Sequence, residues 1–79
     1  MRHYIIEATV MKDGSCPKAI YLKEDRNQAI MQFHQTLASA MSNDKVESCL
    51  CMVINEYGNT EIADRYEVEQ PEPEPNEEG

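Results

Sequence analysis

Hydrophobic and polar residues alternate with a period of two near both ends of the chain. In an extended segment, residues 3–11 lie on two opposite faces. One face carries Tyr4, Ile6, Ala8 and Val10, and the other carries His3, Ile5, Glu7 and Thr9. Residues 60–68 alternate in the same way, with Ile62, Tyr66 and Val68 on one side. This pattern is typical of half-buried strands, so we predict a strand in each segment.

Two further strands are predicted between these segments. Residues 19–22 follow Pro17, which lacks a backbone donor, so they fit a short or edge strand. Residues 46–54 are apolar on both faces, as expected of a central strand. Asp13-Gly14 and Gly58-Asn59 have the residue types of tight turns. The strands therefore pair as two hairpins.

Between the hairpins, hydrophobic residues recur at helical spacing. An apolar stripe is formed by Ile30, Phe33, Leu37, Ala40 and Met41, which predicts a helix over residues 25–42. Its other side carries Gln28, Gln32 and Gln35, and residues 27–43 contain no Lys, Arg, Asp or Glu. Solvated helices usually carry charged pairs, whereas interface centres are depleted in charge. We therefore predict that this Gln-rich face contacts another chain.

These elements predict an α+β fold of ββαββ order in residues 1–68. One helix would cover one face of a small antiparallel sheet, and the other face would lack a cover within the chain. We expect the uncovered face to carry Ile5, Cys49, Cys51 and Val53. Together with the three glutamines, these are the interface candidates, because an exposed apolar face favours self-association.

The acidic charge is concentrated at the end of the chain. The 79 residues have a net charge of −8, with 7 Lys and Arg against 15 Asp and Glu. Six of the acids follow position 66, leaving nine acids against seven bases, a net of −2, in residues 1–66. Residues 69–79, rich in Pro and Glu, are predicted to be disordered. The absence of a basic cluster argues against nucleic-acid binding.

We expect a cytoplasmic protein that does not bind membranes. The sequence has neither a membrane-length apolar run nor a signal-type start. Its three cysteines cannot form a complete set of intramolecular disulfides, which suits a reducing compartment.

No cofactor, metal or catalytic activity is predicted. Cys16, Cys49 and Cys51 are the only candidate thiolate ligands, but the Cys-x2-Cys spacing of zinc sites is absent. We therefore expect the cysteines to act as small hydrophobic residues. His34 is interpreted as a boundary residue of the helix. A body of this size also leaves little room for a ligand pocket.

Several segments resemble short, uncharacterised proteins encoded by phages and prophages of Gram-positive gut bacteria. The resemblance rests on residues 5–10, 18–21, 33–41 and 46–55, with Gly58. It covers nearly all of residues 3–67 and contains no active-site motif. It implies a phage-encoded protein working in a bacterial cytoplasm or in a particle assembled there.

The resulting hypothesis is a non-enzymatic interaction module that self-associates or binds a protein partner, with a role in particle assembly. One alternative is an inhibitor of a host defence or regulatory protein, to which the acidic tail could contribute. Another is a small zinc or thiol-redox module that uses the three cysteines.

Overall fold

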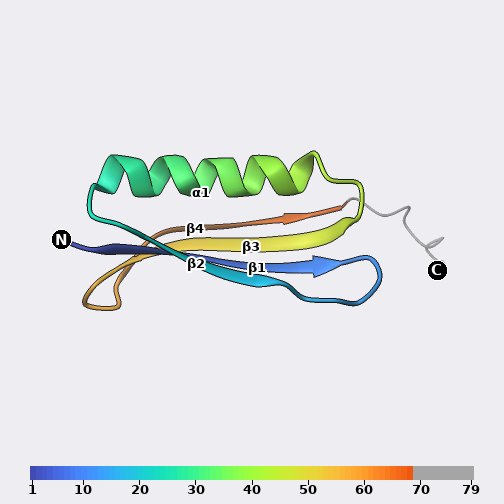
Figure 1. The fold of residues 1–79 in the computed structure, drawn as a ribbon, viewed down its shortest axis with the longest axis horizontal. Helices are drawn as coiled ribbons and strands as arrows, with labels where there is room; N and C mark the ends of the chain where they lie inside the picture. The colour runs from blue at the N-terminus through green and yellow to red at the C-terminus, as the bar shows by residue number, and fades with distance from the viewer. Residues whose placement is uncertain (69–79) are drawn as a thin grey trace, which may run out of the picture.

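The chain folds into two β-hairpins joined by one helix in the computed structural model, which describes residues 1–68 (Figure 1). The elements are β1 (His3–Met11), β2 (Lys18–Lys23), α1 (Arg26–Met41), β3 (Val46–Asn55) and β4 (Thr60–Glu67). All neighbouring strands pair antiparallel, in the order β2-β1-β3-β4. The predicted ββαββ fold is confirmed, while the disorder predicted for residues 69–79 lies outside the described residues.

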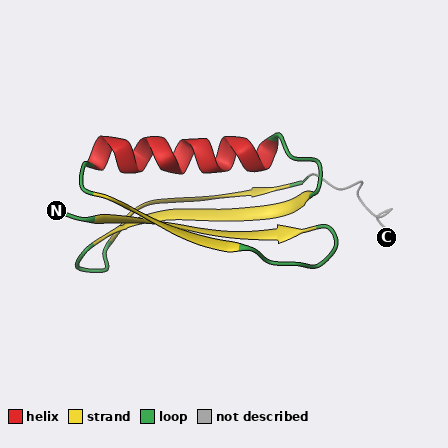
Figure 2. Ribbon diagram, viewed as in Figure 1, coloured by secondary structure: helices red, strands yellow, loops and turns green. Residues whose placement is uncertain are grey.

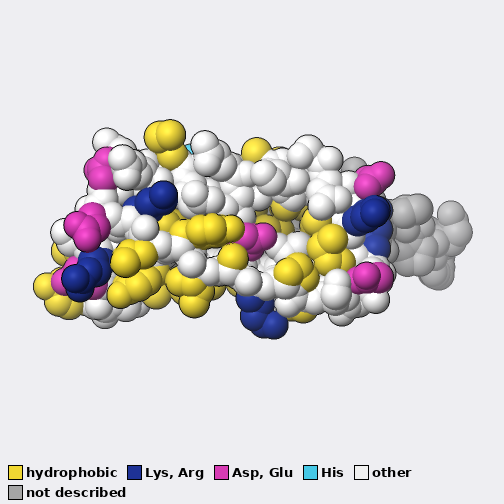
Figure 3. Space-filling model, in the orientation of Figure 1, with side chains coloured by type: hydrophobic (Ala, Val, Ile, Leu, Met, Phe, Trp, Pro, Cys, Tyr) yellow, Lys and Arg dark blue, Asp and Glu magenta, His cyan; other side chains and the backbone are white. Residues whose placement is uncertain are grey.

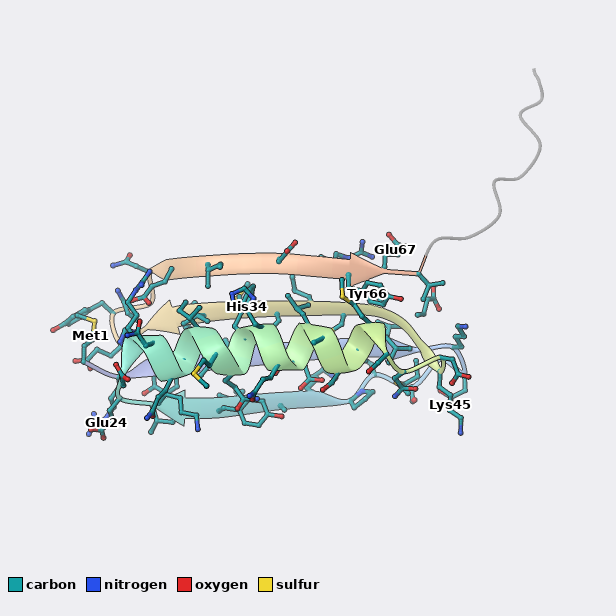
Figure 4. All side chains as sticks on the ribbon, turned by 90° about the horizontal axis from the view of Figure 1, so that it is seen from above. Met1, Glu24, His34, Lys45, Tyr66 and Glu67 are labelled. Atoms are coloured by element: carbon teal, nitrogen blue, oxygen red, sulfur yellow. The ribbon has the colours of Figure 1, made fainter. Side chains whose placement is uncertain are left out.

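The domain has two layers. The helix lies along one face of the sheet, and no other described element covers the opposite face (Figure 2). Seen from the helix side, α1 runs over the middle of the sheet, with β2 and β4 on either side of it (Figure 4). Its main contacts are with β3 and β1, and it makes fewer with the two edge strands. The prediction that one sheet face lacks a cover is therefore confirmed.

The identity of the uncovered face was predicted wrongly. Ile5, Cys49, Cys51 and Val53 are fully buried under α1, where they pack with Phe33 and other helix residues. Periodicity gave the wrong face, because β3 is apolar on both sides and α1 packs on the more polar side of β1, where His3, Glu7 and Thr9 flank Ile5. These four residues belong to the core and are removed from the interface candidates.

Local sequence explains how the elements begin and end. The Asp25 carboxylate accepts a hydrogen bond from the Asn27 backbone N–H (3.3 Å), so Asp25 caps the start of α1. Gly14 and Gly58 adopt φ of 94° and 87° in the two hairpin turns. This left-handed region is disfavoured for side chains with a Cβ, and no other described residue has a positive φ. The predicted turns are thus formed at their glycines.

Charged side chains are distributed unevenly over the molecule. On the face seen in Figure 3, most of them gather toward the two ends, while uncharged side chains cover the helix. Hydrophobic side chains lie along the half of this view occupied by the sheet. On this face, uncharged side chains therefore predominate between the two ends.

Candidate functional site

The uncovered side of the sheet, termed the open face, is built from side chains in register across the strands. Strand pairing aligns three rows, which are Leu22–Tyr4–Ile54, Ile20–Ile6–Met52–Ala63 and Lys18–Ala8–Leu50–Arg65. Because side chains alternate along a strand, these positions share the face opposite Ile5 and Val53. The first two rows contain no charged residue. The open face therefore has an apolar centre.

Several large hydrophobic side chains of the open face are in contact with solvent. Ile20, Leu22 and Leu50 are 69%, 50% and 39% exposed, whereas Ile5 and Val53 on the covered face are 0% exposed. Tyr4, Ile6, Met52 and Ile54 are half-buried. A contiguous exposed apolar patch on a small protein is typical of an interaction site.

Charged residues lie at the two ends of this patch. Lys18 and Arg65 occupy the outer positions of the third row, on the two edge strands. At the other end, Glu24 follows β2 and Glu56 follows β3. The Glu56 carboxylate accepts a hydrogen bond from the Arg2 backbone N–H (2.6 Å). Figure 4 shows two acidic residues, Glu24 and Glu67, at opposite ends of the molecule, so each end carries negative charge. The patch is thus apolar in the middle and charged at both ends, and at one end Arg65 is ion-paired with Glu67 of the same chain (2.7 Å).

A second candidate site lies on the helix side of the sheet. Because α1 packs mainly over β3 and β1, a groove of about 460 Å³ remains between the helix and β2. It is lined by Glu7, Thr9, Met11, Pro17, Tyr21, Gln32, Gln35, Thr36, Ser39, Ala40, Asn43 and Val46. The expectation that this domain is too small for a pocket is therefore wrong, because the helix does not cover the edge strand.

Glu7 is the charged residue of this groove. The Thr9 hydroxyl donates a hydrogen bond to Glu7 Oε2 (2.8 Å), and the Tyr21 hydroxyl lies 3.4 Å from Oε1. Burial, and then the charge of Glu7, raise the pKa of Tyr21. The phenol is therefore protonated at neutral pH and remains a donor to the carboxylate. Within residues 1–68, Glu7 forms no ion pair.

The three candidate interface glutamines are not equivalent. Gln32 and Gln35 line the groove, and Gln32 Nε2 donates to Thr36 Oγ1 (3.2 Å). Gln28 is exposed on the first turns of α1 and is not part of the groove lining. The uncharged helix face predicted from sequence therefore contributes one wall of a polar groove.

The cysteines are divided between the core and a loop. Cys49 and Cys51 are fully buried, whereas Cys16 is exposed between β1 and β2. Burial, with smaller effects of Cys49 and Glu7, raises the pKa of the Cys51 thiol from 9.0 to about 11. A protonated, inaccessible thiol is a poor nucleophile and ligand. Among residues 1–68, no three His, Cys, Asp or Glu side chains group as metal ligands. Their burial therefore makes Cys49 and Cys51 poor zinc ligands and poor redox thiols.

The two histidines have different environments. The exposed His34 lies on α1 (Figure 4), with its ring edge-on to Phe33 and centroids 5.1 Å apart. His3 is buried, and its Nδ1 lies 3.2 Å from Glu61 Oε1, which is also 3.4 Å from Arg26 Nε. The cluster of His3, Glu61 and Arg26 connects β1, β4 and the start of α1, so we assign it a structural role.

Sequence reasoning predicted an uncovered sheet face but assigned it the wrong residues, and it missed the groove. Glu7 lies two residues after the core residue Ile5, so both side chains are on the same face of β1. A charged residue on the core side of a strand was the feature of the sequence that could have indicated the groove. The open-face residues Ile6 and Met52 were assigned to the side under the helix. Both errors follow from the choice of the covered face.

Comparisons with known protein families, with curated proteins and with solved structures find no match. In the part of the chain that the structure describes, α1 falls short of the length and apolarity needed to cross a membrane.

Proposed function

We propose that this protein is a non-enzymatic interaction module that self-associates by packing the open faces of two copies together. The observation that carries the proposal is the row of Ile20, Ile6 and Met52 across an uncovered sheet. In a face-to-face β-sandwich, such residues interdigitate between sheets about 10 Å apart. The phage context, a role in particle assembly and a cytoplasmic location follow from the sequence resemblance and are part of the same proposal.

The charge pattern supports a second copy as the occupant of the open face. The two copies can be related by a two-fold axis that lies between their open faces, runs perpendicular to the strands and passes between the two uncharged rows. This operation would place the Leu22–Tyr4–Ile54 row of one copy over the Ile20–Ile6–Met52 row of the second copy. The same operation brings Lys18 near Glu24 of the second copy, and Arg65 near Glu56 of the second copy. Lys18 is then opposite a charge of the other sign, while Arg65 also retains its pairing with Glu67 of the same copy. An isologous interface needs this self-complementarity.

The energetics favour a weak dimer. Full burial of a Leu, Ile or Met side chain contributes about 1.5–3 kcal/mol, whereas association costs roughly 4–15 kcal/mol in lost freedom. The three most exposed side chains of the patch, Ile20, Leu22 and Leu50, offset only part of that cost. The half-buried residues and the rim ion pairs must contribute the remainder. We therefore expect an equilibrium between monomer and dimer.

Native mass spectrometry and sedimentation of the untagged, reduced protein over a concentration series test the proposal. A dimer is expected, and Ile20→Lys should convert it to monomer, because a charge then lies in the apolar centre. Met31→Lys is the matched control, since Met31 is also an exposed hydrophobic residue but lies on α1 (59% exposed). A wild-type protein that stays monomeric at every concentration would refute self-association.

A charge-exchange experiment tests the arrangement of the two copies. Lys18→Glu and Glu24→Lys should each weaken the dimer, because each places like charges opposite one another. The double variant should recover much of the lost affinity, since the pair is restored with its signs exchanged. A double variant that dimerises no better than the two single variants would exclude this two-fold arrangement while leaving the open face as the interface.

A further inference from the structure

The groove between α1 and β2 contains a carboxylate at a position typical of the core. Glu7 lies on the covered side of β1, in register with Cys51 and between Ile5 and Thr9, which are buried. The Glu7 side chain itself is only half-buried, because α1 does not extend over β2. A charged group in such a place is costly unless it is paired. Nevertheless, no Lys or Arg of residues 1–68 forms an ion pair with it.

The neighbours of Glu7 orient the carboxylate without neutralising it. Thr9 and Tyr21 each supply one hydroxyl, at 2.8 and 3.4 Å. An ionised carboxylate has about four acceptor positions, so acceptor capacity remains free. The other polar groups of the lining are uncharged amides and hydroxyls, including those of Gln32 and Gln35. The groove therefore presents one negative charge among neutral hydrogen-bonding groups.

The remaining lining is aliphatic. Met11, Pro17 and Val46 contribute apolar surface to the groove. Its volume of about 460 Å³ falls within the range of small-molecule sites. An occupant that matches these features has an aliphatic stem and one cationic end group able to donate several hydrogen bonds.

We infer that the groove between α1 and β2 binds an aliphatic amine or guanidine, with Glu7 accepting hydrogen bonds from the cationic group. The same chemistry is found in a free diamine or guanidine and in the Lys or Arg side chain of a protein. The groove is on the opposite side of the sheet from the open face, so this inference is independent of dimer formation.

The test is an NMR titration of the full-length protein that follows the backbone amides and the side-chain amides of Gln32, Gln35 and Asn43. One probe is agmatine, and the other is an unstructured peptide with a single lysine. The control peptide has norleucine in place of that lysine. We expect saturable shifts confined to the groove for at least one cationic probe, and none for the norleucine peptide. Saturable shifts with agmatine alone would indicate that the ligand is a free small molecule. Saturable shifts with the lysine peptide alone would indicate that the ligand is a protein side chain.

Glu7→Gln should weaken binding by at least about tenfold, because a charge-assisted hydrogen bond becomes a neutral one. Asp64→Asn is the matched control. Like Glu7, Asp64 is an acidic residue in register with Cys51, but it lies on β4 and outside the groove lining. The spectra of both variants report whether they are folded. Absence of saturable shifts with either cationic probe, or equal affinity for Glu7→Gln and the wild type, would overturn the inference whatever the oligomeric state.

Discussion

At the scale of single residues, burial decides what each reactive group can do. Cys16 and Cys51 have the same thiol, but Cys16 is exposed in a loop while Cys51 is sealed under α1. Glu7 and Glu61 are both half-buried carboxylates, yet only Glu61 has cationic neighbours in Arg26 and, when protonated, His3. Residue type alone would not have distinguished either pair.

The cysteines should differ sharply in reactivity. In the folded protein, a thiol reagent at mildly alkaline pH is expected to modify Cys16 rapidly and to leave Cys49 and Cys51 unmodified, because both are fully buried. Mass spectrometry of the reaction with and without urea measures this difference. Rapid modification of all three thiols without denaturant would contradict the buried placement of β3.

Cys51 should also make stability depend on alkaline pH. Its pKa is raised on folding from 9.0 to about 11, so the folded state retains the proton that the unfolded state loses. The stabilisation is complete below pH 9 and is lost as the pH rises toward 11. Urea denaturation at several pH values should show this decrease, and Cys51→Ala should reduce it. An unchanged pH dependence in the variant would assign the effect to other groups.

At the scale of elements, the helix start and the hairpin turns are specified by residues close in sequence. Asp25 caps α1 through its own side chain, and Gly14 and Gly58 provide the positive φ of the turns. The bounds of the strands and of the helix agree with the sequence prediction to within a few residues. These features could be predicted because each depends on neighbours along the chain.

Removing the helix cap should destabilise the domain moderately. Asp25→Ala is expected to lower the free energy of unfolding by about 1 kcal/mol, because the Asn27 N–H loses its acceptor. Asp25→Asn should retain most of the stability, since Asn is an equally good cap. Chemical denaturation of the three proteins measures the difference. Equal losses in both variants would point to the charge of Asp25 and not to capping.

At the scale of the whole molecule, the single helix leaves the domain with two unequal sheet faces. The covered face forms a small core around Phe33, Ile5 and Val53. The open face resembles the inner side of a sandwich that lacks its second sheet. A chain of this length buries only about 60% of its unfolded surface, so association would also stabilise the fold.

The melting temperature should therefore increase with protein concentration. This follows from mass action if the dimer dissociates on unfolding. The dependence should be retained in Met31→Lys and absent in Ile20→Lys, which removes the association. Differential scanning calorimetry over a concentration series provides the measurement. A melting temperature independent of concentration in the wild type would argue against a folded dimer.

Periodicity and turn residues, both local properties, determined the order, types and approximate bounds of the elements. They also determined that one sheet face would lack a cover. Only the tertiary structure decided which face this was, because β3 is apolar on both sides and the stripe of Phe33 and Leu37 packs on the more polar side of β1. β2 and β3 run parallel with β1 between them, and a crossover between parallel strands is right-handed, so the strand order determines which face α1 covers. That order depends on pairing between segments that are distant in sequence. The groove at Glu7 likewise exists only because α1 lies over β1 and β3 and not over β2.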